Sequence, residues 1–194
     1  PPPRQVAEQC HEEEVDRQQH AARVVAVVLG RERRRERDQD DEQQGLYLTF
    51  ELDNEYYGLW IGYVTEIIGI LPFTEVPELP AYVRGIFNLR GRIIPLMDLR
   101  LRFQKKFVEY DERSCVIVID VAANTVGLIV DSVSEVIAFS EADIIEQPML
   151  SSGVSNQFIK SIGKVGNEVK LLLNCDKLLS NQEIEILINE KDER

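Results

Sequence analysis

Between residues 58 and 176 a strand-rich block of sequence occurs twice. The segment from Gly58 to Ile68 aligns with the segment from Gly127 to Ile137, 69 positions later, and Gly, Leu, Val, Glu and the final Ile are identical in place. A second block repeats at a shift of 78 and places Asp98 on Asp176. Two similar halves of about 70 residues predict two small β-barrels, because closing a sheet removes its exposed edges and units of this size need to pack on each other.

Alternation of apolar and polar side chains marks the strands, because neighbouring residues of a strand face opposite sides of the sheet. Hairpin turns are expected at Arg90-Gly91 and at Gly166-Asn167. The expected strands are 46–52, 56–61, 64–71, 86–89, 92–97, 114–121, 125–130, 133–139, 158–165 and 168–175. Helices are few and short; one begins at Ser180, whose spacing to Glu183 is that of a capping box, and ends near Asn189. The pattern predicts an all-β chain, mainly β with few short helices.

The composition changes at Gly45. Residues 1–44 hold eight arginines but no lysine, isoleucine or aromatic residue, and they carry 8 positive and 11 negative charges. Three interpretations of this tail stay open: a charged helix with an apolar patch over 21–29 and a basic run over 31–37, a solvated disordered tail, and a segment foreign to the rest of the chain. We therefore expect a charged tail over 1–44 and a β domain over 45–190.

Charge and hydropathy exclude several kinds of partner. The formal net charge is -12, which opposes binding to nucleic acid or to an anionic membrane surface. No apolar run approaches the 18 residues or so that a membrane span needs. The cysteines, Cys10, Cys115 and Cys175, are isolated and odd in number, which favours a reducing, cytoplasmic location over a disulfide framework.

Catalytic and metal-binding patterns are weak. The chain has no histidine after residue 44 and no nucleotide-binding, metalloprotease or nucleophile-elbow motif, so the commonest general base is missing from the β region. Glu66 and Glu135 occupy equivalent repeat positions, but a surface glutamate is the default interpretation of each. Cys10, His11 and His20 lack a fourth metal ligand at a sensible spacing. We expect no enzyme activity, no cofactor and no metal; the competing hypothesis is an orphan enzyme on a small β-barrel.

The stretch over 85–100 combines a tight turn with charge. Gly91 allows a positive φ at the turn, and Asn88 and Arg90 have hydrogen-bonding capacity to spare. Leu89 adds an apolar neighbour. Arginine beside apolar residues is typical of protein interfaces, which makes this turn a candidate for contact with another protein.

The same stretch resembles the signature of the chemotaxis coupling protein family, CheW. The resemblance covers roughly residues 45–190 in the family's order, and the combination of its motifs is highly specific. It rests on Phe50 to Gly58, Asn88-Leu89-Arg90-Gly91, Ile93-Ile94-Pro95, Asp98-Leu99-Arg100, Val126 to Asp131 and Cys175-Asp176-Lys177-Leu178-Leu179.

The resemblance implies two five-stranded SH3-like barrels packed together and a non-catalytic adaptor. Members of the family join the cytoplasmic tip of chemoreceptors, a helical hairpin, to the regulatory domain of the histidine kinase CheA. They also meet other CheW-like domains in rings. We therefore expect a cytoplasmic protein recruited to membrane-anchored receptor arrays, with no nucleic acid partner and no membrane insertion. A coupler of a non-flagellar pathway, such as twitching motility, is the alternative.

The resemblance also implies the binding residues. Receptor contact is expected in an apolar groove between the barrels, with polar residues beside it. In the repeat, Ile61 and Val64 correspond to Val130 and Val133, so both halves can line one seam; the competing interpretation is that these side chains are simply core. The residues implied for receptor binding are Ile61, Val64, Glu66, Gly85, Arg90, Cys115, Gly127, Val133 and Val136, with the turn completed by Asn88, Leu89 and Gly91.

Overall fold

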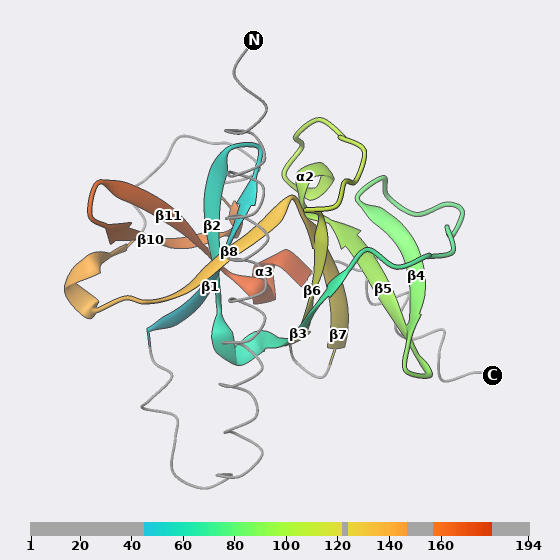
Figure 1. The fold of residues 1–194 in the computed structure, drawn as a ribbon, viewed down its shortest axis with the longest axis horizontal. Coiled ribbons are helices and arrows are strands. Elements are labelled where there is room, and N and C mark those ends of the chain that lie inside the picture. The colour runs from blue at the N-terminus through green and yellow to red at the C-terminus, as the bar shows by residue number, and fades with distance from the viewer. Residues whose placement is uncertain (1–44, 122–123, 147–156, 180–194) are drawn as a thin grey trace, which may run out of the picture.

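The computed structural model describes residues 45–121, 124–146 and 157–179, and these residues form two β-sheets that pack against each other (Figure 1). Sheet A has six strands in the order β8-β1-β2-β11-β10-β9, and sheet B has five in the order β3-β6-β7-β5-β4. This architecture confirms the expected all-β fold with few short helices. The strands are β1 Leu46–Leu52, β2 Glu55–Trp60, β3 Val64–Gly69, β4 Val83–Leu89, β5 Arg92–Asp98, β6 Cys115–Val121, β7 Asn124–Val130, β8 Ser132–Ala138, β9 Ile144–Glu146, β10 Ile159–Val165 and β11 Glu168–Leu173.

The two halves of the repeat exchange strands. Sheet A combines β1 and β2 of the first half with β8 to β11 of the second, whereas sheet B combines β6 and β7 of the second half with β3 to β5 of the first. The chain crosses between sheets at the 3₁₀ turn η1, Ile61–Tyr63, and at the single residue Asp131. Each sheet contains one parallel pairing between a strand of the first half and a strand of the second half. In sheet A this is β2 with β11, and in sheet B it is β5 with β7. Neither half therefore makes a barrel from its own strands alone.

Each sheet curls so that the chain leaving one edge strand pairs with the other edge. In sheet B, Thr74 follows β3 and exchanges backbone hydrogen bonds of 2.8 and 2.9 Å with Ile86 of β4. In sheet A, β9 follows β8 and pairs with β10, and this short segment is the sixth strand beyond the expected five. The closure in sheet B needs Gly85, because a Cβ there would lie 2.1 Å from the Thr74 carbonyl oxygen and the φ of Gly85 is +142°.

Three apolar clusters follow from the alternation of side chains along the strands. On β6, Cys115, Ile117 and Ile119 face a large central cluster between the sheets, whereas Val116 and Val118 face the interior of sheet B. The interior of sheet A is smaller and is built from Tyr47, Phe139 and Leu172. Most of the buried apolar surface thus lies where the two sheets meet.

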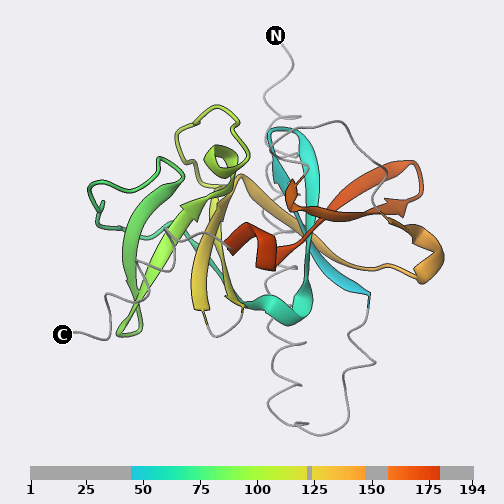
Figure 2. The ribbon, with the colours of Figure 1, turned by 180° about the vertical axis from the view of Figure 1, so that it is seen from behind.

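Short helices lie at equivalent points of the repeat, after β5 and after β11. Helix α2, Leu99–Arg102, is capped by Asp98, whose carboxylate accepts the backbone N–H of Leu101. Helix α3, Cys175–Leu179, lies between the two sheets (Figure 2). The strand expected to run to residue 175 ends at Leu173, because the Asn174 side chain accepts the backbone N–H of Lys177 at 3.0 Å and starts this helix instead.

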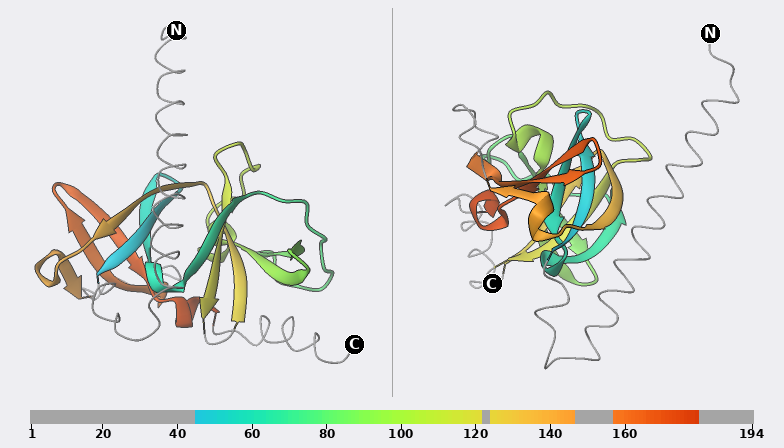
Figure 3. Two further views of the ribbon diagram at one scale, coloured as in Figure 1. Left: turned by 60° about the horizontal axis from the view of Figure 1, so that its bottom comes forward. Right: turned by 90° about the vertical axis from the view of Figure 1, so that its left-hand side faces the viewer.

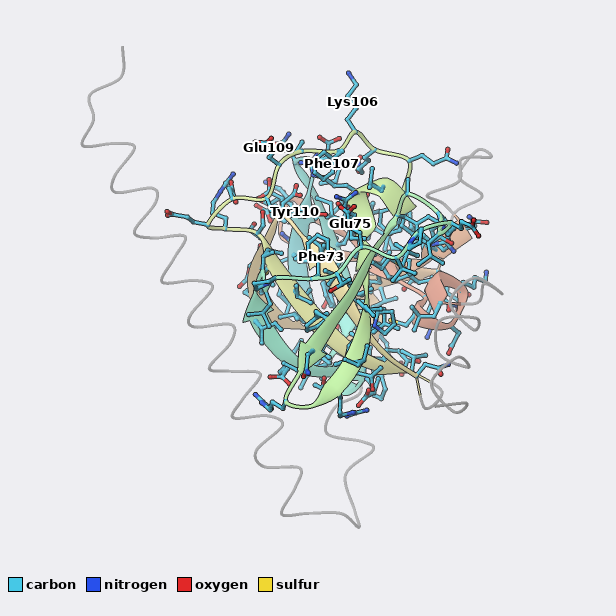
Figure 4. The ribbon with its side chains drawn as sticks, turned by 90° about the vertical axis from the view of Figure 1, so that its right-hand side faces the viewer. Phe73, Glu75, Lys106, Phe107, Glu109 and Tyr110 are labelled. Carbon is cyan, nitrogen blue, oxygen red and sulfur yellow. The ribbon has the colours of Figure 1, made fainter. Side chains whose placement is uncertain are left out.

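The loop from Phe103 to Ser114 covers one end of sheet B (Figure 4). Tyr110 and Phe73 pack against the sheet B interior, and the Tyr110 hydroxyl donates to Asp98 at 2.9 Å. Lys106 points away from the barrel into solvent. The expected tail over 1–44 and the expected helix from Ser180 lie outside the described residues.

Candidate interaction surface

The turn between β4 and β5 has a fixed shape. Arg90 and Gly91 have φ values of +53° and +87°, the conformation that a two-residue hairpin turn requires. The Asn88 side chain accepts the backbone N–H of Gly91 at 2.8 Å and so closes the turn from inside. This hydrogen bond and the positive φ of Gly91 account for the asparagine and the glycine, and they hold Arg90 at the tip of the turn.

Arg90 joins the two edge strands of sheet B. Its Nη2 donates to Oε2 of Glu66 at 2.7 Å, and Glu66 lies on β3 whereas Arg90 follows β4. The Arg90 side chain is 76% exposed and that of Glu66 is 24% exposed. An ion pair this exposed contributes about 0–1 kcal/mol to stability, so its main effect is to present a guanidinium and a carboxylate together at the surface.

Four of the predicted groove residues lie inside the molecule. Ile61, Val64, Cys115 and Val133 belong to the central cluster and are at most 7% exposed. Val64 pairs with Ile119 at the start of β3, and Val133 occupies the equivalent position on β8. They line the seam where the chain crosses between sheets, as the repeat predicts, but their side chains fill it rather than leaving an open groove.

The two predicted glycines also face inward. Gly85 permits the closure of sheet B, and Gly127 lies on β7 against the sheet B interior. A Cβ at Gly127 would be 2.8 Å from Val116 Cγ1 and 3.0 Å from the Phe87 ring. Close packing therefore explains both glycines, and neither offers a side chain to a partner.

The remaining predicted residues reach the surface. Glu66, Asn88, Leu89, Arg90 and Gly91 gather at one end of sheet B, where they are exposed or partly buried. Val136 is partly buried on β8 of sheet A and packs against the central cluster. Among the described residues, the predicted site thus divides into a charged turn, a separate valine and a buried seam.

The sequence did not predict a group of charged residues that links the two sheets, which we call the charged clasp and which is built on Asp131 and Arg100. Asp131, at the crossing from sheet B to sheet A, accepts two hydrogen bonds of 2.6 Å from the guanidinium of Arg100 on α2. It also accepts the backbone N–H of Asp53, in the β1–β2 turn, at 2.8 Å. Hydrogen bonding to Asp131 and the nearby carboxylates raise the pKa of Arg100, although its partial burial acts in the opposite direction. Both residues stood in the family signature, but 31 positions separate them and no local pattern pairs them.

Lys105 extends the clasp. Its ammonium lies 2.6 Å from Glu55 and 3.5 Å from Asp53, and the Tyr57 hydroxyl donates to Glu55 at 2.7 Å. The hydrogen bond from Lys105 lowers the pKa of Glu55, with a further lowering from Tyr57. These ion pairs and hydrogen bonds therefore fasten the β1–β2 turn of sheet A to the α2 segment and loop that connect β5 and β6 of sheet B.

The described cysteines are unsuited to act as nucleophiles. Burial raises the pKa of Cys115 and of Cys175 to about 12, so both stay protonated near neutral pH. In the part of the chain that the structure covers, no group of three or more His, Cys, Asp or Glu side chains could hold a metal ion. Over the same residues no helix has the length and apolar character needed to cross a membrane.

Comparison with known proteins gives a consistent result. The sequence model of the CheW-like domain matches residues 46–183. The chain is 35% identical over 143 residues to the chemotaxis protein CheW of Klebsiella aerogenes, covering 74% of this chain and 86% of that protein. It is 33% identical over 154 residues to the chemotaxis protein CheW of Treponema pallidum, covering 77% and 90%.

Two further matches bear on the fold and on the range of relatives. The scaffolding protein TtCheW from Thermoanaerobacter tengcongensis has a similar crystal structure, with a TM-score of 0.67 and 32% identity over 72% of this chain and 94% of that one. Protein FrzA of Myxococcus xanthus is 25% identical over 117 residues, covering 60% and 73%.

Proposed function

Because this chain belongs to the CheW-like domain family, we propose that it couples membrane-anchored chemoreceptors to the histidine kinase CheA. The chain is a scaffold and coupling protein of chemotaxis, as its relatives are. The finer steps are our proposal: it binds the helical hairpin at the receptor tip, binds the regulatory domain of CheA, and meets other CheW-like domains in rings. It would work in the cytoplasm, recruited to receptor arrays.

The rigid, exposed turn at Arg90 carries this proposal. A partner that docks there meets a guanidinium and a carboxylate side by side on a turn whose backbone is already fixed, so no backbone entropy of the turn is lost on binding. Arginine is enriched among the residues that dominate binding energy at interfaces. Charged groups at the rim also increase the rate of association with a complementary surface.

We assign the residues in two groups. Glu66, Asn88, Leu89, Arg90, Gly91 and Val136 would touch partners, because they reach the surface. Ile61, Val64, Gly85, Cys115, Gly127 and Val133 would support binding by holding the seam and the barrel closure in shape. A substitution in the second group therefore affects binding through the fold.

An adaptor role without enzymatic activity is also part of the proposal. It is supported by the chemistry of the described residues, which include no histidine and only two cysteines, both buried with raised pKa values. The match to FrzA, a relative not named a chemotaxis protein, supports a second candidate: a coupler in a different chemosensory pathway.

Reconstitution tests the coupling directly. The full chain is mixed with a receptor-tip hairpin and the CheA regulatory domain, and the mixture is separated by size-exclusion chromatography. We expect all three to elute together, and each of the two pairs that contain the chain to form alone. If the chain elutes apart from both partners at micromolar concentrations, the proposed function is wrong.

A further inference from the structure

A pocket of about 380 Å³ lies at the end of sheet A where the described chain begins. It is bounded by Gly45, by β2 and η1, and by the start of α3. Figure 3 shows η1 and α3 next to each other. Three aromatic side chains and a carboxylate line it, namely Tyr47, Trp60, Tyr63 and Asp176.

The aromatic wall is held in place by its neighbours. Trp60 and Tyr63 meet edge to face, with ring centroids 5.1 Å apart. A Cβ at Gly62 would lie 2.3 Å from the Trp60 ring, so the glycine lets the indole fold back on the turn. Tyr47 meets Phe139 edge to face at 5.7 Å. The rings are thus set before any ligand arrives.

The chemistry of the pocket favours a planar cation. Burial and then the charge of Asp176 raise the pKa of Tyr63, which is consistent with a carboxylate close to that ring. Aromatic faces beside a carboxylate suit a guanidinium, which stacks on rings and binds carboxylates at the same time. Lys160 also lines the pocket, but its side chain is exposed and can extend toward solvent.

The sequence places such cations shortly before Gly45. Five arginines stand in the basic run over 31–37, and only residues 38–44 separate this run from Gly45. Seven extended residues span about 23–25 Å, which is ample for a return to a pocket that Gly45 itself lines. Residues 45–194 carry a net charge of -9, the difference between -12 for the whole chain and -3 for the tail, so the domain attracts the run.

The attachment point is fixed. The backbone N–H of Phe139 donates to the Gly45 carbonyl at 2.7 Å, and a Cβ at Gly45 would lie 2.5 Å from the Phe139 oxygen. Gly45, the residue to which the tail is joined, is therefore held at a set position on the pocket wall. A tether this short gives the arginines an effective concentration on the order of millimolar.

We propose that an arginine of the run over 31–37 occupies the pocket formed by Tyr47, Trp60, Tyr63 and Asp176. The tail then folds back on the end of sheet A and covers it within one molecule. This inference is independent of the partners proposed above and needs neither of them for its test.

Trp60 is the only tryptophan of the chain, so its fluorescence reports on the pocket alone. The measurement is acrylamide quenching of the full-length protein and of a variant in which Arg31, Arg33, Arg34, Arg35 and Arg37 are changed to Gln. We expect the quenching constant to rise about twofold in the variant, because a stacked guanidinium covers one face of the ring. Adding salt to about 0.5 M should also raise the quenching constant of the wild-type protein, because salt screens the ion pair between the arginine and Asp176.

Two controls make the result specific. Changing Arg4, Arg17 and Arg23 to Gln removes tail charge outside the run and should leave quenching unchanged. Asp176→Asn should raise quenching as the run variant does, with the melting temperature retained. Equal quenching in the wild type and the run variant would overturn the proposal. So would protection that disappears on dilution, because the arginine would then come from a second copy.

Discussion

Replacing Val64 with Thr keeps the shape of a side chain that is 1% exposed in the central cluster, but it buries a hydroxyl. The lost methyl costs about 0.8 kcal/mol, and an unsatisfied hydroxyl costs about 1–3 kcal/mol more. We therefore expect Val64→Thr to lower the free energy of unfolding by about 2–4 kcal/mol. For a chain of this size that corresponds to a fall of roughly 4–16 °C in Tm.

The assay is thermal unfolding followed by circular dichroism, together with receptor-tip binding below the transition. Val136→Thr is the matched control for the unfolding measurement alone, because Val136 is only partly buried and the same substitution should cost under about 1 kcal/mol there. At temperatures where Val64→Thr is folded, binding should stay near the wild-type level. A variant with wild-type Tm that no longer binds the receptor tip would show that Val64 is a surface contact and that our core assignment is wrong.

Three further predictions concern the scaffold. Asp131→Asn removes the charge that holds Arg100 and should cost about 1.5–3 kcal/mol in urea unfolding; a loss under 0.5 kcal/mol would mean the clasp contributes nothing. Gly127→Ala overpacks the sheet B interior and should cost about 1–3 kcal/mol in the same assay, whereas an unchanged midpoint would show that the interior has room. The hydrogen bond from Lys105 lowers the folded-state pKa of Glu55. The stabilisation from this interaction is therefore fully present above the ordinary pKa of a glutamate, and it is lost as pH falls through the lowered folded-state pKa of Glu55. The Tm gap between wild type and Lys105→Gln should thus shrink below about pH 4.5, and a gap that stays constant would contradict this coupling.

Most of the strands could be predicted from the sequence, because each depends on local alternation and on turn residues. Gly58 and Gly127, which are equivalent positions of the repeat, show that the repeat also predicted equivalent packing. Each faces the interior of its own sheet, where a Cβ would lie 2.7 Å from Leu172 in one case and 2.8 Å from Val116 in the other. The identity of these two positions reflects the same packing need met twice.

The pairing of the halves could not be predicted in the same way. Period-two alternation shows which side chains share a face, but it does not show which strand lies alongside, so the exchange between sheets left no local signal. Val64 illustrates the consequence for the site, because a valine that lines an open groove and one that fills a seam have the same pattern. The pairing of Arg100 with Asp131 likewise depends on the crossing between sheets.

We propose that the exposed turn at Arg90, rather than the buried seam, makes the contact with partners. The most direct test of this proposal is the Kd for the receptor tip and for the CheA regulatory domain, measured by calorimetry on the wild type, Arg90→Glu and the matched charge reversal Lys106→Glu. We expect Arg90→Glu to weaken binding to at least one partner about tenfold or more, with Tm unchanged and with Lys106→Glu binding as the wild type does. Wild-type affinity of Arg90→Glu for both partners would contradict the account.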